Sequence, residues 1–239
     1  MQNNATDKLS PLKKLTAEQE ALVNQIINFT NQHLNNNFPA TFTIYGDAGT
    51  GKSVVLSALF DQIQKLRQTK NSNFYQTNNY FLVNHPEILK VYKQIAGPLP
   101  ELLKKNFQRP TSFINQLDKK QKEADIVIID EAHLLLSKPD HYNNFYHDNQ
   151  LVEIIKRSKV VILVFDPYQV LKMKTLWTKE RLERITHLYP HKEYYLKHQF
   201  RMNASSDLID WFNSFTENKI IKPIPDLSLI HISEPTRPY

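Results

Sequence analysis

The most informative stretch of the sequence is Gly46-Asp47-Ala48-Gly49-Thr50-Gly51-Lys52-Ser53, which fits the pattern G-x-x-x-x-G-K-[ST] at every fixed position. Residues 41–45 before it are β-branched, aromatic or apolar and predict a buried strand. Residues 54–66 after it have the apolar spacing of a helix. Because strand, glycine-rich turn and helix follow one another, the stretch predicts a phosphate-binding P-loop (Walker A motif). A chance match in a surface turn would lack this context.

This loop has the chemistry needed to hold ATP and Mg²⁺. A turn of backbone N–H groups that leads into a helix N-terminus favours the negative charges of a polyphosphate. Three of the four glycines of the chain lie here, and they let the backbone pass close to the phosphates. We expect Lys52 to pair with the β- and γ-phosphate oxygens and Ser53 to coordinate Mg²⁺. The predicted nucleotide contacts are Gly46, Asp47, Ala48, Gly49, Thr50, Gly51, Lys52 and Ser53.

The composition narrows the class of protein. The 239 residues suffice for one large α/β domain, or for one domain and part of a second. The absence of cysteine excludes a disulfide framework and thiolate metal sites, which favours a reducing, cytoplasmic location. No apolar run reaches the roughly 20 residues of a membrane span, and the polar start lacks the apolar core of a signal peptide. The net charge of +6 is compatible with a polyanionic partner.

Strands and helices alternate along the chain. Apolar or β-branched runs predict further strands at 80–83, 126–129, 160–165 and 194–196. Helical spacing or capping signals predict helices at 15–34, 86–95, 151–157 and 206–215, mostly helical structure at 171–185, and partly helical structure at 103–122. This alternation predicts an α/β fold with a doubly wound, mostly parallel sheet and helices on both faces.

Asp130-Glu131 directly follows the predicted strand at 126–129. Parallel sheets place their ligands at the carboxyl ends of the strands, so these side chains should lie beside the P-loop. We expect Asp130 to reach the Mg²⁺ ion, as in a Walker B motif, and Glu131 to act as the general base on the attacking water. His133 completes a D-E-A-H string; it either couples the nucleotide site to the next strand or is a polar loop residue.

Two later segments also follow strands. In Asp166-Pro167-Tyr168-Gln169, Gln169 could contact the γ-phosphate or the attacking water; alternatively, the segment is a turn in which Asp166 is a cap. In Gln199-Phe200-Arg201, Arg201 could supply positive charge to the transition state. Without the other segments, this triplet does not predict a function.

Together, these segments resemble the first motor domain of superfamily-one helicases, a RecA-like P-loop NTPase domain. The resemblance covers residues 15–215 and is nearest to the Schlafen-like DNA/RNA helicase-domain family, in which a similar Q-F-R segment precedes a helix. It implies that Gln19 reads the adenine of ATP, and that Glu131, Lys52, Gln169 and Arg201 act in hydrolysis. The sequence departs from the pattern at Phe165, where many relatives have glycine, and no motif of a second motor domain is present.

The domain organisation that we expect has four parts: a disordered lead-in at 1–14, the ATPase domain at 15–204, the start of a truncated second region at 205–226, and a tail at 227–239. The tail resembles the translation of a transposase adapter used in sequencing libraries. We therefore expect the tail to be an artefact that is not part of the fold. The alternative is a genuine irregular tail.

Three functions fit these features. The preferred one is an ATP-hydrolysing motor that moves on single-stranded DNA or RNA, here a truncated first motor domain with weak activity. The second is a nucleotide-gated switch in defence or signalling, and the third is a small-molecule kinase, which the water-directed Glu131 disfavours. The basic run from Lys104 to Lys122 could bind nucleic acid, with stacking by Tyr80, Tyr92, Phe107 and Phe113. Alternatively, these aromatics are core residues and the lysines form a solvated face.

Overall fold

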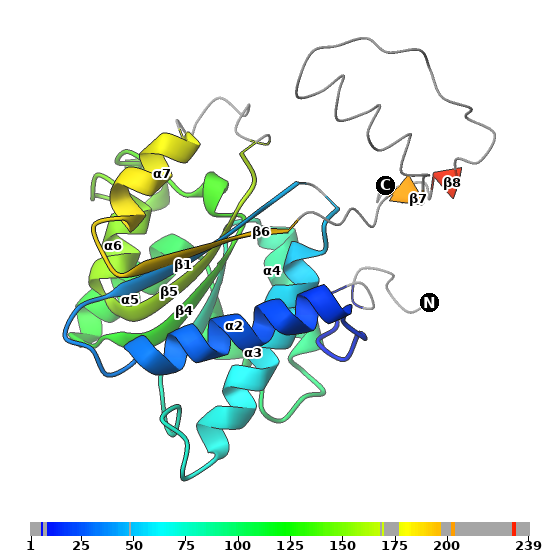
Figure 1. Cartoon of the computed structure of the whole chain (residues 1–239). Coiled ribbons are helices and arrows are strands. Elements are labelled where there is room, and N and C mark those ends of the chain that lie inside the picture. The colour runs from blue at the N-terminus through cyan, green and yellow to red at the C-terminus, as the bar shows by residue number, and fades with distance from the viewer. Residues whose placement is uncertain are drawn as a thin grey trace, which may run out of the picture.

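The computed structural model describes residues 6, 9–47, 49–167, 169 and 177–196, and the backbone of 202–203 and 231–232. Its centre is a parallel six-stranded sheet in the order β3-β2-β4-β5-β1-β6 (Figure 1). The strands are β1 (Ala40–Gly46), β2 (Asn79–Val83), β3 (Phe107–Gln108), β4 (Ala124–Asp130), β5 (Ser158–Phe165) and β6 (His191–Leu196). Every neighbouring pair in this sheet is parallel, which confirms the predicted fold class.

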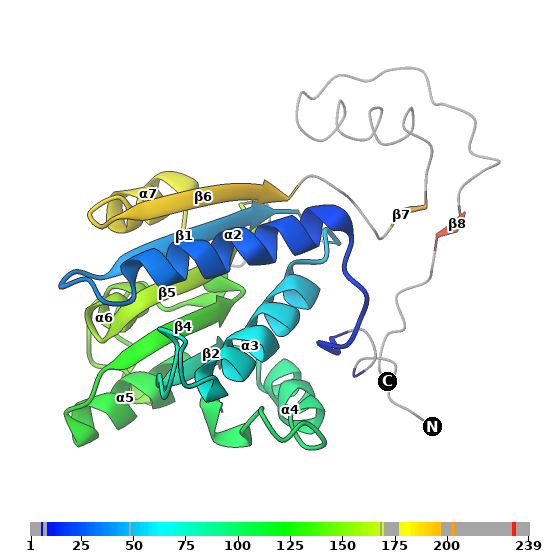
Figure 2. The same ribbon diagram turned by 60° about the horizontal axis from the view of Figure 1, so that its bottom comes forward.

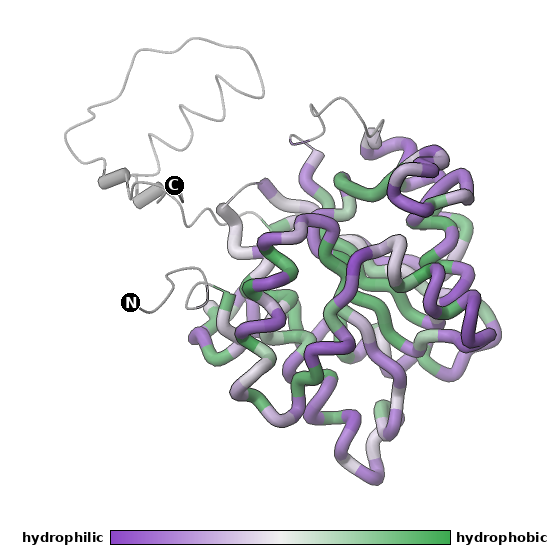
Figure 3. The backbone as a smooth tube through the Cα atoms, turned by 180° about the vertical axis from the view of Figure 1, so that it is seen from behind, coloured by the Kyte–Doolittle hydropathy of each residue, from purple (hydrophilic) through white to green (hydrophobic). Residues whose placement is uncertain are grey.

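Helices cover both faces of the sheet (Figure 2). One apolar core lies beneath α2 (Ala17–His33), α3 (Lys52–Gln68) and α4 (Pro86–Ile95). The other lies beneath α5 (Pro110–Lys120), α6 (Gln150–Lys156) and α7 (Lys179–Thr186). The central strands β1, β4 and β5 are almost entirely buried, as their continuous apolar runs require. Figure 3 shows the same separation, with hydrophobic residues along the strands and hydrophilic residues on the outer helices.

The helix boundaries follow local chemistry. Thr16 caps α2 and forms a reciprocal capping box with Gln19. Proline occupies the first turn of α4 and of α5, where a missing N–H group costs nothing. Among the described residues, no helix is long and apolar enough to cross a membrane.

The structure differs from the predicted elements at two places. The segment 103–122 contains the short strand β3 and a 3-10 turn, η1 (Lys104–Asn106), as well as α5. Helix α7 begins at Lys179, and residues 171–176 lie outside the described part of the chain. The predicted helix at 206–215 and most of the tail also lie outside it. The two short strands β7 (Met202–Asn203) and β8 (His231–Ile232) pair with each other in antiparallel fashion.

Candidate nucleotide site

Three segments meet at one edge of the sheet. The P-loop follows β1, Asp130 is the last residue of β4, and Asp166 follows β5. Because the strands are parallel, their carboxyl ends lie at the same edge, and β5 lies between β1 and β4. The strand order therefore inserts Asp166 between the P-loop and the acidic pair Asp130-Glu131.

The P-loop backbone is a tight turn into α3. Gly49 and Gly51 have φ angles of 94° and 79°, which a side chain would strain. The Thr50 hydroxyl donates to the carbonyl oxygen of Asp47 at 2.9 Å and closes the turn. Ala48 lies outside the described residues.

Lys52 is held at the mouth of this turn. Its Nζ donates to the carbonyl oxygens of Gly46 and Asp47, each at 2.6 Å, and lies 3.3 Å from Oδ2 of Asp166. The side chains of Lys52 and Asp166 are only 6% and 1% exposed, so this ion pair is buried. Gln169 Nε2 donates to the same Asp166 oxygen at 2.8 Å. Sequence reasoning missed Asp166 as the partner of the P-loop lysine; its position after a buried strand was the available signal.

Asp130 is buried beside the start of α3. Ser53 Oγ lies 3.4 Å from Oδ1, and the hydroxyl of Tyr92 donates to Oδ2 at 3.0 Å. Burial and the neighbouring charge of Glu131 raise the pKa of Asp130 to about 6, whereas the hydrogen bonds from Tyr92 and Ser53 and the charge of Lys52 oppose this rise. A buried carboxylate beside a serine hydroxyl is an oxygen donor set of the kind that suits Mg²⁺, and a divalent cation would offset the cost of burying this charge.

Glu131 has an uncommon backbone conformation. Its φ and ψ angles are 57° and 54°, in the left-handed region, and it caps the 3-10 turn η2 (Ala132–Leu134). Its Oε2 lies 2.9 Å from Nε2 of His133, whose side chain is 2% exposed. His133 also meets the ring of Phe165, at the end of β5, edge to face with centroids 6.3 Å apart. His133 is thus a buried contact between Glu131 and β5.

The structure gives Gln19 a local role. Helix α2 begins at the end of the sheet where β1 ends (Figure 2). Gln19 is 5% exposed, and its Oε1 accepts a hydrogen bond from the backbone N–H of Thr16 at 3.1 Å. Its predicted contact with adenine stays a prediction. Arg201 and the rest of the Q-F-R segment lie outside the described residues.

Three of the four aromatic residues that could stack on nucleic-acid bases are buried, so the stacking interpretation is wrong for them. Tyr92, Phe107 and Phe113 are 1%, 2% and 0% exposed, because they pack in the two cores. Tyr80 is partly buried, with its ring edge to face against Phe113 at 5.0 Å. Tyr142 and Tyr146, which no sequence pattern singles out, are 94% and 64% exposed.

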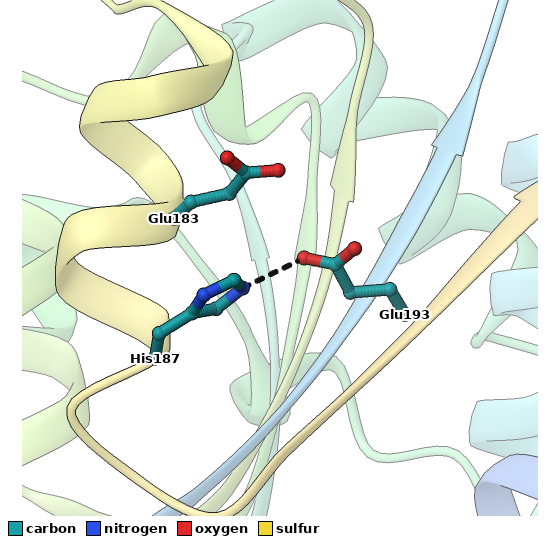
Figure 4. A group of neighbouring side chains, drawn as sticks. All are labelled: Glu183, His187 and Glu193. Atoms are coloured by element: carbon teal, nitrogen blue, oxygen red, sulfur yellow. Dashed lines mark hydrogen bonds and ion pairs between the residues drawn. The ribbon is translucent and has the colours of Figure 1, made fainter.

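A second cluster of titratable side chains joins α7 to β6 (Figure 4). His187 Nε2 lies 3.0 Å from Oε1 of Glu193, and Lys179 Nζ lies 3.4 Å from Oε1 of Glu183. The hydroxyl of Tyr45 donates to Glu193 at 3.4 Å. Glu183, His187 and Glu193 have the spacing of metal ligands, but each is engaged with a neighbouring side chain. We interpret these contacts as structural, because they hold α7 against the edge strand β6.

Comparison with known proteins finds one curated relative and several solved structures. An uncharacterized protein of Saccharomyces cerevisiae is 39% identical over 236 residues; the match covers 92% of this chain and 52% of the relative, so the chain spans about half of its length. The Pif1 helicase of Candida albicans is 18% identical, with a TM-score of 0.45, over 90% of this chain and 46% of that one. The Orc1 protein of Aeropyrum pernix, solved in complex with DNA, is 15% identical, with a TM-score of 0.48, over 89% and 53%.

The chain also matches a protein family. The family described as Schlafen group 3, DNA/RNA helicase domain, matches residues 39–233, which include the P-loop, Asp130-Glu131 and the segment after β5. This range is most of the chain. The protein therefore belongs to the Schlafen group 3 DNA/RNA helicase-domain family.

Proposed function

We propose that this domain binds ATP with Mg²⁺ and hydrolyses it, as the first motor domain of a protein that moves on single-stranded DNA or RNA. The observation that carries the proposal is the convergence of Lys52, Asp130 and Asp166 at the carboxyl edge of the sheet. Membership of a DNA/RNA helicase-domain family supports the nucleic-acid partner. Translocation belongs to the whole protein, of which a second motor domain would be part.

The side chains divide the chemistry among them. Lys52 and the P-loop N–H groups would hold the β- and γ-phosphates, and Ser53 and Asp130 would hold Mg²⁺. The bound ion would neutralise charge that develops on the phosphates. Glu131 would accept a proton from the attacking water, with its carboxylate positioned by His133 at 2.9 Å. Gln169 and Arg201 would respond to the γ-phosphate, and Gln19 to adenine.

Replacing Tyr92 with phenylalanine tests the metal role of Asp130 without replacing a P-loop residue. The hydroxyl donates to Asp130 at 3.0 Å, and its loss should raise the pKa of Asp130 further. A hydrogen bond to a charged group contributes about 1.5–3 kcal/mol, so we expect the Mg²⁺ concentration for half-maximal ATP binding to rise roughly tenfold. Titration of Mg²⁺ at fixed ATP measures this shift. Tyr189→Phe, on the opposite face, is the control; an unchanged Mg²⁺ requirement in Tyr92→Phe would remove Asp130 from the metal site.

The motor and the switch are separated by the effect of nucleic acid on turnover. A motor should hydrolyse ATP at least tenfold faster with single-stranded DNA or RNA, and the stimulation should fall steeply with salt because phosphate contacts release counterions. The steady-state rate of the full-length protein with and without a homopolymer measures it. A flat response in the presence of demonstrated ATP turnover would favour the nucleotide-gated switch.

A further inference from the structure

A cavity of about 330 Å³ lies at the opposite edge of the sheet from the nucleotide site. Asn79, the first residue of β2, lines it, as do Arg67 in the last turn of α3 and Lys120 at the end of α5. Amino ends of parallel strands lie away from the carboxyl ends, so this cavity is separate from the P-loop. Its volume falls in the range of small-molecule sites, about 300–1,000 Å³.

The cavity exists because β3 is short. This edge strand pairs with β2 only at Phe81 and Leu82. On the side of β2 that faces away from β4, the described part of the chain places no strand beside Asn79 and Tyr80. The ends of α3 and α5 and the η1 turn surround this open part of the sheet edge.

Positive charge gathers around the cavity. Arg67, Lys105, Lys120 and Lys122 line it, with Glu123 as the one carboxylate among the lining residues. In the described part of the chain, none of these three lysines pairs with a carboxylate, whereas Lys65, Lys90, Lys156 and Lys159 each do. Arg67 is oriented by a hydrogen bond of 2.7 Å from its Nε to the carbonyl oxygen of Thr77. The cavity therefore offers four cationic groups to an anionic ligand.

The remaining lining is suited to a ligand larger than a lone phosphate. Gln108 Nε2 donates to the carbonyl oxygen of Lys105 at 2.8 Å and to Oε1 of Gln116 at 3.1 Å, which ties the η1 turn to α5. Tyr80 adds a partly buried aromatic ring, and Leu103 adds exposed apolar surface. An apolar wall beside clustered cations is the combination that a nucleotide, with its planar base and its phosphate, requires.

We propose that this cavity binds a nucleoside phosphate, either as a free mononucleotide or as the phosphorylated end of a nucleic-acid strand. Lys105, Lys120 and Lys122 neutralise the phosphate, Arg67 fixes its position, and Tyr80 with Leu103 contacts the base. This site does not depend on ATP hydrolysis or on the P-loop, and it gives the basic segment a function that the buried aromatics do not provide.

The test compares two double variants that remove the same charge from adjacent positions. Lys105→Ala with Lys120→Ala removes two cations that line the cavity; Lys104→Ala with Lys119→Ala removes their exposed neighbours, which do not line it. The probes are AMP, measured by calorimetry, and a 3′-labelled single-stranded 12-mer with a 5′-phosphate or a 5′-hydroxyl, measured by fluorescence anisotropy. Each is also measured in Lys52→Ala, which weakens any binding of the probe at the P-loop.

We expect the cavity variant to weaken binding of one phosphorylated probe at least tenfold, and the neighbour variant to change it less than twofold. Loss of AMP binding identifies a free nucleotide as the ligand; loss of the preference for the 5′-phosphate identifies a strand end. Lys52→Ala should leave either effect intact. Equal losses in the two double variants, or a cavity variant that binds every probe as the wild type does, would overturn the proposal.

Discussion

Replacing Lys52 with alanine is expected to lower the rate of ATP hydrolysis by about 10²–10³-fold, because a preorganised donor to the phosphate charge is lost. Lys52 is the cationic residue of the P-loop, and its Nζ lies 2.6 Å from each of two P-loop carbonyl oxygens. Nucleotide affinity should fall as well, since Lys52 contacts the phosphates in the ground state too. Steady-state hydrolysis and binding of a fluorescent ATP analogue, both with the full-length protein, measure the two effects.

Lys52→Ala should also lower the stability of the domain, and the experiment must distinguish this effect from the loss of catalysis. Asp166 is 1% exposed, and its carboxylate would lose the ammonium 3.3 Å away. Removing one partner of a buried ion pair costs about 3–5 kcal/mol, so Lys52→Ala should unfold at a lower temperature. Lys52→Arg keeps the positive charge but replaces the compact ammonium group with a planar guanidinium group. We expect this variant to fold normally and to hydrolyse ATP much more slowly than the wild type. Lys90→Ala, on the exposed side of α4, is the control. Turnover of Lys52→Arg and Lys52→Ala within twofold of wild type would exclude Lys52 from catalysis.

Replacing Glu131 with glutamine should separate ATP binding from ATP hydrolysis. Glutamine has nearly the same shape and can keep a hydrogen bond to His133, but it cannot accept a proton from water. General-base catalysis contributes about 10²–10⁴-fold, and turnover should fall by that factor. The ATP affinity should remain within about threefold of wild type, because Glu131 is not expected to contact the phosphates. Binding and single-turnover hydrolysis of radiolabelled ATP measure both quantities.

Glu123→Gln is the matched control, because Glu123 lies at the other end of the same strand, next to Ala124. It removes one carboxylate from the same segment, and its turnover should equal that of the wild type. If Glu131→Gln hydrolyses ATP as fast as Glu123→Gln, the general base must be another group.

The sequence predicts the elements of this fold better than the contacts between them. Continuous β-branched runs and a fixed glycine spacing identify β1, β4, β5 and the P-loop, because these signals are local. The contact of Lys52 with Asp166 joins residues 114 positions apart, and that of Tyr92 with Asp130 joins residues 38 apart. Both depend on the strand order, which local patterns do not encode. Strand β3 has two residues, too few to show a period of two.

The basic segment shows a different limit of sequence reasoning. Lysines between Lys104 and Lys122 suggest one continuous binding surface, but apolar residues at helical spacing alternate with them. In the structure, Phe113 and Leu117 turn into a core, and Lys119 and Lys120 remain exposed. Only the three-dimensional arrangement shows which lysines border a cavity and which are solvated.

The two edge strands of the sheet affect the tendency of the domain to aggregate. A strand with one free side exposes backbone N–H and C=O groups, and these can recruit a strand from another molecule. On one edge, β3 has only two residues, and the ends of α3 and α5 and the η1 turn surround the part of β2 that β3 leaves unpaired, so no long template is present there in the described part of the chain. On the other, β6 carries His191, Lys192 and Glu193, whose polar and charged side chains oppose the docking of an apolar strand. In the described part of the chain, the short β3 and the charged start of β6 therefore both disfavour the addition of a strand from another molecule.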